Sequence, residues 1–154
     1  MEVKKASHEN LSEIVEFQVQ MAAETENLNL NRETVSAGVQ KIFNNQNLGT
    51  YWGVYEKEKL IACTLTVPEF SEWRNGTVLW IHSVYVIEEY RGKGVFKKIY
   101  NSLKNLVIRD SDYMGLRLYV DKSNHNAQEV YRKLGMDGEH YLVYEWMKKS
   151  KNTH

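Results

Sequence analysis

Residues 84–100 read V-Y-V-I-E-E-Y-R-G-K-G-V-F-K-K-I-Y, and this stretch decides the fold. An apolar run ends at Ile87, a turn continues through Gly94, and a helical pattern with two glycines at its start follows. Four positively charged side chains lie within eight residues of the helix start: Arg91, Lys93, Lys97 and Lys98.

Acidic residues are usual at a helix start, because its unpaired backbone N–H groups carry a partial positive charge. The cations between residues 91 and 98 predict instead that an anion docks at the turn, where backbone N–H groups can donate to phosphate oxygens. A solvated basic helix start after a glycine turn is the alternative, because short glycine motifs are weak evidence alone. The strand–turn–helix context favours the anion site.

The composition of the 154-residue chain, 42% hydrophobic and 26% charged, is that of an ordinary globular protein. Its length predicts a single domain over residues 1–148 with a frayed tail over 149–154. Twenty basic residues balance twenty acidic ones, which disfavours nucleic acid or a membrane surface as a partner. Cys63 has no cysteine to pair with, and neither an export leader nor a membrane span is visible, so we expect a cytoplasmic location.

Hydrophobic periodicity and turn residues place the elements along the chain. Helices are expected after the caps Asn10 and Asn31, after the glycine turn, and from about 124 to 134, with a loop over 68–76. This order predicts a mixed α/β or α+β sheet covered by helices. The expected strands cover residues 3–6, 50–55, 60–67, 77–87, 116–120 and 141–147.

Two motifs carry a resemblance to a known family. The first is V-Y-V-x-x-x-Y-R-G-K-G-V over residues 84–95, and the second is Asn124-x-x-Ala127-x-x-x-Tyr131-x-x-x-Gly135. Separated by one helix and one strand, they resemble the acyl-CoA pyrophosphate loop and the following helix of the GNAT (Gcn5-related) N-acetyltransferase superfamily. The resemblance covers essentially the whole domain and implies a central mixed β-sheet flanked by about four helices.

The resemblance implies acetyl-CoA as a co-substrate and no metal. The backbone of Val84 and Val86 would face the pantetheine arm, with the Val84 N–H near the thioester oxygen. Phe96 stands where the family commonly has Gly or Ala, and we expect it to pack between helix and sheet. The implied cofactor-binding residues are Val84, Tyr85, Val86, Arg91, Gly92, Lys93, Gly94, Val95, Phe96, Lys97 and Asn124. Asn124 would bind the cofactor, cap the last helix, or do both.

Tyr131 matches the residue that many of these enzymes place beside the thioester sulfur as general acid. A phenol with an ordinary pKa of about 10 keeps its proton at neutral pH and can give it to a thiolate. On periodicity alone a core position is the better interpretation, because Ala127, Val130, Tyr131 and Leu134 form one apolar stripe. The motif spacing favours the catalytic one.

The general base is left open. His82 interrupts the apolar run just before the cofactor segment and titrates near neutrality, so it could accept or relay a proton. A hydrogen-bonded core histidine is the commoner case. Glu72 could act through water from the following loop, although loop acids are usually only solvated.

The acceptor side is the least determined part. Family loops imply that Glu26 and Glu69 attract a cationic amine and that Trp73 lines its pocket, and the amine could belong to a small molecule or a peptide. Cys63 lacks an obvious partner base, so a covalent acyl intermediate is not expected.

The sequence therefore predicts an acetyl-CoA-dependent N-acetyltransferase in which a primary amine attacks directly within a ternary complex. The alternative is a non-catalytic acyl-CoA-binding or regulatory module with the same cradle. A nucleotide- or nucleic-acid-binding protein would fit the phosphate turn but not the neutral charge. A homodimer is compatible with the resemblance.

Overall fold

The computed structural model describes residues 1–149. Among these, residues 1–117 and residues 118–149 form two compact units. Apart from residue 149, the frayed tail predicted over 149–154 lies outside the described residues.

The first unit is built on a five-stranded sheet in the order β1-β2-β3-β4-β5. Neighbouring strands are antiparallel from β1 to β4, and β5 runs parallel to β4, so the sheet is mixed as predicted. The strands are β1 (Glu2–Lys5), β2 (Thr50–Glu56), β3 (Lys59–Ser71), β4 (Gly76–Val86) and β5 (Tyr113–Arg117).

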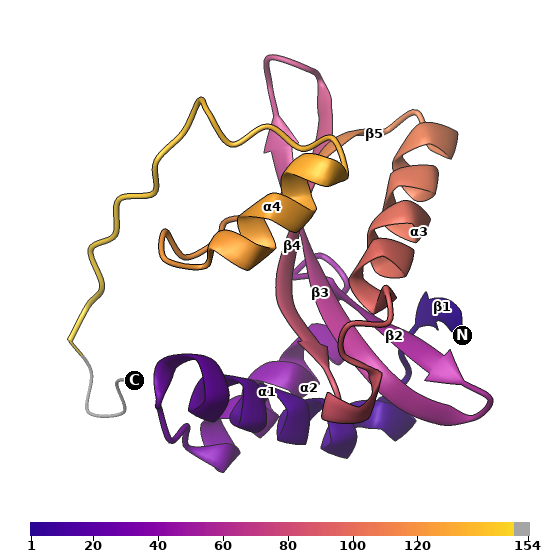
Figure 1. Cartoon of the computed structure of the whole chain (residues 1–154), viewed down its shortest axis with the longest axis vertical. Coiled ribbons are helices and arrows are strands. Elements are labelled where there is room, and N and C mark those ends of the chain that lie inside the picture. Colours follow the sequence, from indigo (N-terminus) through magenta and orange to yellow (C-terminus); the bar gives the residue numbers. More distant parts are fainter. Residues whose placement is uncertain (150–154) are drawn as a thin grey trace. The chain divides into compact units, whose positions relative to one another are not determined.

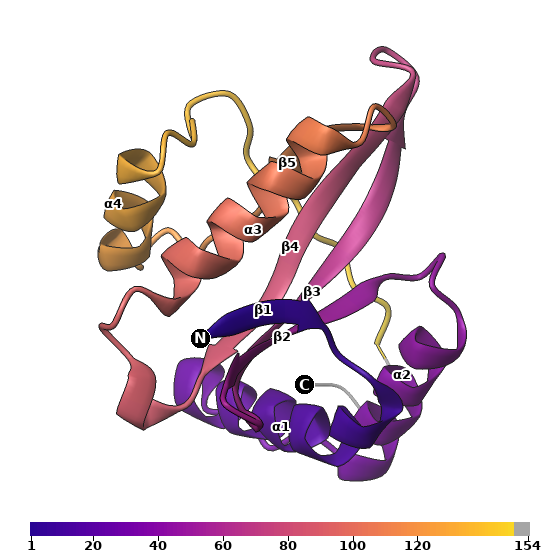
Figure 2. The same ribbon diagram turned by 90° about the vertical axis from the view of Figure 1, so that its right-hand side faces the viewer.

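Helices α1 and α2 lie across one end of the long β3–β4 hairpin, and α3 runs along the other face of the sheet (Figures 1 and 2). The core beneath α1 and α2 includes Ile14, Phe17 and Tyr85. The helix α3 buries Ile99 and Leu103 almost completely. The helices are α1 (Leu11–Glu26), α2 (Arg32–Asn44), α3 (Val95–Arg109) and α4 (His125–Lys133), with short 3-10 turns η1 (His8–Asn10) and η2 (Glu88–Tyr90).

Two of the predicted helix caps are confirmed by hydrogen bonds. The Asn31 side chain accepts from the Thr34 N–H at 2.9 Å, and Asn124 accepts from the Ala127 N–H at 3.0 Å. Asn10 precedes α1 but makes no side-chain cap there; its amide instead donates to Glu13 at 3.1 Å.

The loop predicted over residues 68–76 is wrong in its first part, because β3 continues through Pro68 to Ser71. Pro68 pairs with Leu79 of β4, whereas the last residue of β3 that pairs with β2 is Thr66. Beyond Thr66, which pairs with the first residue of β2, strand β3 has a neighbour on one side only among the described residues, so a proline that cannot donate a ladder bond is tolerated.

The chain from β5 onward departs further from the sequence prediction. The strand predicted over 116–120 ends at Arg117 and begins at Tyr113. Helix α4 is as predicted, with Gly135 left-handed (φ 88°) beyond its end. Residues 141–147, predicted as a final strand, form none, and their apolar side chains are exposed.

Candidate active site

The turn between β4 and α3 uses two glycines in the left-handed region. Gly92 has φ 72° and Gly94 has φ 74°, a conformation that costs other residues about 1–2 kcal/mol. Nothing lies within 4 Å of where a Cβ would stand at either glycine. The glycines are therefore required by the path of the backbone, which leaves an open surface over the turn.

The first turn of α3 contains no acidic residue, and no side chain caps it. Its first intrahelical bond runs from the Lys98 N–H to the Gly94 carbonyl at 3.1 Å, so the N–H groups of Val95, Phe96 and Lys97 precede it. No acidic residue lies in this turn, and Gly94 has no side chain to cap it. Such a start is suited to an anion.

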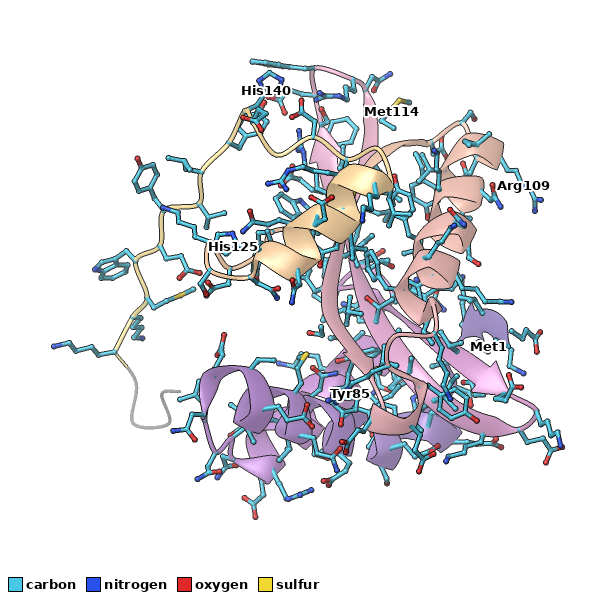
Figure 3. All side chains as sticks on the ribbon, in the orientation of Figure 1. Met1, Tyr85, Arg109, Met114, His125 and His140 are labelled. Carbon is cyan, nitrogen blue, oxygen red and sulfur yellow. The ribbon has the colours of Figure 1, made fainter. Side chains whose placement is uncertain are left out.

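The Arg91 side chain makes hydrogen bonds to other residues of the first unit. Its guanidinium donates to the Glu24 carboxylate of α1 at 2.7 Å and, through Nε, to the Val86 carbonyl at 2.8 Å. It also lies over the Tyr85 ring, 5.5 Å from its centre, while the Tyr85 hydroxyl donates to Gln20 at 2.7 Å. These contacts join the end of α1 to the turn. Figure 3 labels Tyr85, which lies beside α1. Arg91, predicted to bind the phosphates, is therefore paired with the Glu24 carboxylate in this structure.

The lysines of the turn are on the surface. Lys93 lies over the Tyr90 ring at 5.2 Å, and Lys97 is exposed on the first turn of α3. Phe96 is half-buried, with its ring 6.4 Å from that of Tyr100, whereas the neighbouring Val95 is buried. Positive charge therefore lies beside the uncapped N–H groups.

A bulge interrupts β4 at the residues predicted to face the thioester. Cys63 pairs with Tyr85 and Leu65 with His82, so the single residue Thr64 stands opposite both Ser83 and Val84. Ser83 is left-handed (φ 53°). A bulge releases backbone groups from the ladder and re-aims them, and bulges are frequent beside active sites.

Strand β4 also extends beyond its partner on the other side. Among the described residues, β5 pairs with β4 only from Thr77 to Trp80. Residues 81–86 therefore have β3 as their one strand neighbour in the described chain, which leaves room for an extended ligand to follow β4.

His82 lies on this part of β4. Its carbonyl accepts from the Thr64 hydroxyl at 2.8 Å, and its ring stacks with that of Trp80, with centres 6.1 Å apart. Burial lowers the pKa of the His82 imidazole below its ordinary value. The neutral ring is therefore favoured near pH 7, as both a base and a core histidine require.

The residues predicted for the acceptor side are not brought together. Glu69 accepts from Arg117 at 3.0 Å and from the Trp80 indole at 3.2 Å. Glu72 and Trp73 lie in the turn at the tip of the β3–β4 hairpin, where Trp73 is exposed. Glu26 ends α1, at the opposite end of the hairpin from that tip (Figures 1 and 2).

Tyr131 and Asn124 belong to the second unit. Tyr131 is half-buried on α4, and burial raises the pKa of its phenol, so the hydroxyl keeps its proton at neutral pH. The side-chain oxygen of Asn124 accepts a hydrogen bond from the Ala127 N–H and so caps α4. A protonated phenol is what a general acid needs.

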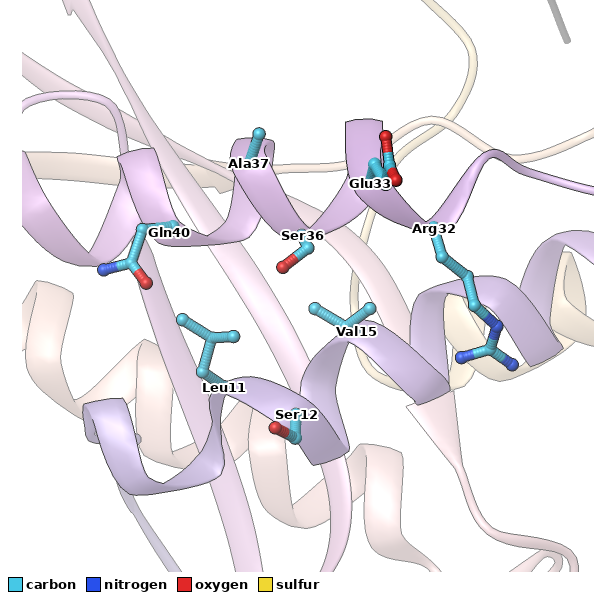
Figure 4. Close-up of a pocket in the computed structure, with 8 residues that line it drawn as sticks. All are labelled: Leu11, Ser12, Val15, Arg32, Glu33, Ser36, Ala37 and Gln40. Atoms are coloured by element: carbon cyan, nitrogen blue, oxygen red, sulfur yellow. The ribbon is translucent and has the colours of Figure 1, made fainter.

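Neither Cys63 nor the groove between α1 and α2 coincides with the predicted site. Cys63 is fully buried, and burial raises the pKa of its thiol to about 12. A groove between α1 and α2 is lined by no predicted site residue (Figure 4): it is formed by Leu11, Ser12, Val15, Arg32, Glu33, Ser36, Ala37 and Gln40.

Two further negative findings concern residues 1–149 only. No three His, Cys, Asp or Glu side chains gather there as metal ligands. None of the described helices has both the length and the apolar character needed to cross a membrane.

The sequence argument missed the bulge opposite Thr64 and the contact from Gln20 to Tyr85. The polar pair His82–Ser83 within an apolar strand is a signal for the bulge, because such a break marks irregular pairing. Nothing local signals the Gln20 contact, since the two residues are 65 positions apart.

Comparison with known proteins agrees with this geometry. The sequence model of the Acetyltransferase (GNAT) family matches residues 13–136. A crystal structure of a possible acetyltransferase from Clostridium difficile 630 is similar over 97% of this chain and 98% of that one, with 36% identity and a TM-score of 0.90.

More distant solved structures share the fold. A predicted acetyltransferase from Clostridium acetobutylicum, solved with acetyl-CoA, is 19% identical, covers 94% of this chain and 95% of its own, and has a TM-score of 0.71. An aminoglycoside acetyltransferase from an uncultured soil metagenomic sample, in complex with sisomicin, is 14% identical over 97% of this chain and 96% of its own, with a TM-score of 0.76.

Proposed function

The chain belongs to the acetyltransferase (GNAT) family, and from that premise we propose that it transfers an acetyl group from acetyl-CoA to a primary amine by direct attack in a ternary complex. The observation that carries the proposal is the turn at residues 91–97. Two left-handed glycines there precede a helix start that has no side-chain cap and no acidic residue in its first turn.

The residues of the first unit fit acetyl-CoA. The N–H groups of Val95, Phe96 and Lys97 would bind the diphosphate, with Lys93 and Lys97 adding charge. The backbone of Val84 and Val86 would bind the pantetheine arm, because β4 extends there beyond its pairing with β5. Acetyl-CoA would supply an activated acetyl group as a thioester.

The reaction needs a neutral acceptor nitrogen, donors for the developing oxyanion and a proton for the departing thiolate. A new C–N bond forms, the C–S bond breaks, and the amine loses one proton while the sulfur gains one. A lysine-type amine has a pKa of about 10.4, so it arrives mostly protonated and must lose that proton too.

We assign these tasks to residues of this chain. The Val84 N–H, re-aimed by the bulge, would donate to the carbonyl oxygen. Tyr131 would give its proton to the sulfur, which its raised pKa supports. His82 would accept or relay the amine proton, and its lowered pKa keeps the ring neutral for that role. Glu72 would act only through water.

The acceptor is assigned by class alone. A cationic amine could be attracted by the exposed carboxylate of Glu72 at the hairpin tip or by that of Glu26 at the opposite end of the hairpin, whereas Glu69 is already paired with Arg117. Trp73, exposed on the hairpin tip, would pack against the acceptor's apolar part. Small-molecule and peptide amines both remain within this class.

A thiol-release assay tests the proposal. The protein would be given acetyl-CoA with polyamines, amino acids, aminoglycosides and peptides in turn, with amine-free and Tyr131→Phe reactions as controls. Amine-dependent release of coenzyme A is expected with at least one acceptor. Tight binding of acetyl-CoA without release from any amine would favour the non-catalytic module, and absence of binding would end both.

A further inference from the structure

Three parts of the first unit meet at the Arg91 side chain: the last turn of α1, the end of β4 and the turn before α3. The Arg91 Nη2 group donates to the Glu24 carboxylate at 2.7 Å, and its Nε donates to the Val86 carbonyl at 2.8 Å. The guanidinium also lies over the Tyr85 ring, 5.5 Å from the ring centre. Arg91 is therefore held in place by groups from α1 and from β4.

The Val86 carbonyl lies on the side of β4 that faces away from β3. In an antiparallel pair, successive residues point their backbone groups alternately toward the partner strand and away from it. The next residue, Ile87, donates its N–H to the Ile61 carbonyl of β3 at 3.0 Å, so the groups of Val86 point the other way. The pantetheine arm is assigned to this side of β4, and its amide N–H groups need carbonyl acceptors. Arg91 and the arm would therefore compete for the same carbonyl.

The end of α1 receives its only printed cation from Arg91. Its last turn contains the acidic residues Glu24 and Glu26 and no basic residue, although the C-terminal end of a helix already carries a partial negative charge. The Tyr85 hydroxyl lies 3.3 Å from the Glu24 carboxylate and adds a donor to it. An anion that binds Arg91 must therefore draw it away from this carboxylate.

On the basis of the proposed function, we propose that Arg91 acts as a latch on the coenzyme site and that the diphosphate opens it. In this structure the latch consists of Arg91 on Glu24 and Val86. A diphosphate at the start of α3 draws the guanidinium to itself, because phosphate oxygens bind arginine through the same fork of donors as a carboxylate. The Val86 carbonyl is then released to accept from the pantetheine arm. The diphosphate and the arm of acetyl-CoA thus help each other to bind.

The latch is held weakly enough to open. The Arg91 and Glu24 side chains are 43% and 44% exposed, so solvent screens the ion pair, and pairs of this kind contribute little to stability. A diphosphate carries more negative charge than one carboxylate and offers more acceptor oxygens, which favours the exchange of partners. A tie with a purely structural role is expected at a buried position, where leaving a charge unpaired is costly.

Calorimetric titrations of Arg91→Ala with S-acetylpantetheine and with acetyl-CoA test the latch, because only the second ligand carries the diphosphate. The backbone of Arg91 is extended (φ −67°) and suits alanine. The variant should bind S-acetylpantetheine about two- to tenfold more tightly than the unmodified chain, as expected when one hydrogen-bond acceptor is released. It should bind acetyl-CoA more weakly, because a cation is lost.

Lys93→Ala is the matched control. Lys93 is a cation of the same turn, but it lies over the Tyr90 ring. This variant should also bind acetyl-CoA more weakly, whereas its affinity for S-acetylpantetheine should equal that of the unmodified chain. Opposite changes for the two ligands are thus expected from Arg91 and not from Lys93.

Inorganic pyrophosphate gives a second test that includes the unmodified chain. Pyrophosphate at millimolar concentration should raise the affinity of the unmodified chain for S-acetylpantetheine, and by linkage S-acetylpantetheine should raise the affinity for pyrophosphate by the same factor. Both gains should vanish in Arg91→Ala, because the coupling acts through that side chain.

Binding of S-acetylpantetheine to Arg91→Ala that is unchanged, weaker or undetectable would overturn the latch. So would the absence of any gain from pyrophosphate in the unmodified chain, or a gain that persists in Arg91→Ala. These results would leave the proposed function standing as long as the unmodified chain binds acetyl-CoA. Failure of the unmodified chain to bind acetyl-CoA would overturn the proposed function and the latch together.

Discussion

Residues 84–100 rest on a buried core, whereas residues 118–149, which carry Tyr131, bury no side chain. In the first region Tyr85 packs against Phe17, with ring centres 5.0 Å apart, and Ile99 of α3 is fully buried. In the second, the helix α4 leaves even Val130 43% exposed. The proposed cofactor turn therefore lies on a packed core, whereas the unit that carries the proposed acid has no fully buried side chain among its described residues.

The largest effect expected is on chemistry, from the weakly packed region. Tyr131→Phe should lower kcat by about 100-fold or more, since general acids contribute about 10²–10⁴-fold, and should leave the Kd for acetyl-CoA nearly unchanged. Steady-state rates and calorimetric titration measure the two. A rate kept within threefold would mean that Tyr131 only packs.

The comparison predicts that truncating a side chain to alanine lowers the free energy of unfolding much more in the first region than in the second. Ile99→Ala removes a fully buried side chain and should lower the free energy of unfolding by about 2–5 kcal/mol. Val130→Ala, on the exposed face of α4, should change it by less than about 0.5 kcal/mol. Urea unfolding curves measure both, and equal losses would remove the contrast.

Gly94→Ala tests whether the turn must be left-handed. With φ 74° the new side chain should cost about 1–2 kcal/mol, which is about tenfold in affinity for acetyl-CoA if the turn gives way. Gly38→Ala is the control, because Gly38 lies inside α2 with no atom near its Cβ position. Unchanged affinity in Gly94→Ala would show that the turn does not hold the diphosphate.

The ion pair between Glu24 and Arg91 gives a smaller effect. Both side chains are nearly half exposed, so Glu24→Gln should cost less than about 1 kcal/mol of stability. The substitution also removes the negative charge beside Arg91, and affinity for acetyl-CoA should rise by a few-fold, whereas Arg91→Gln should lower it. A fall in both variants would mean that Arg91 only positions the turn.

His82 should give the smallest effect, through pH. Because its pKa is lowered in the folded chain, the unfolded chain binds more protons as pH falls below about 6.5, and stability declines there until the folded-state pKa is reached. The ring is half exposed, so the loss should stay under about 1 kcal/mol. His82→Gln should remove this slope and His125→Gln should not; unfolding curves from pH 5 to 8 would show it.

The sequence predicted the parts of the fold that local patterns encode. The β4–turn–α3 unit and the Asn31 and Asn124 caps are present because glycine conformation and cap hydrogen bonds depend on neighbours within a few residues. Pro68 is tolerated in β3 because β2 begins at Thr50, opposite Thr66, and no local window of sequence contains that fact.

The site was less accessible to sequence reasoning for the same reason. The cations of the turn are visible in the sequence, but the pairing of Arg91 with Glu24 joins residues 67 positions apart. Residues 141–147 have the composition of a strand yet form none among the described residues. A strand also needs a partner, and no local window of sequence contains that partner.

Calorimetric titration with acetyl-CoA and with S-acetylpantetheine tests the central claim most directly, because the two ligands share the thioester and the arm but only the first carries the diphosphate. If the first turn of α3 holds that diphosphate, acetyl-CoA should bind at least about tenfold more tightly, a difference of about 1.4 kcal/mol. Equal affinities for the two ligands would contradict the account.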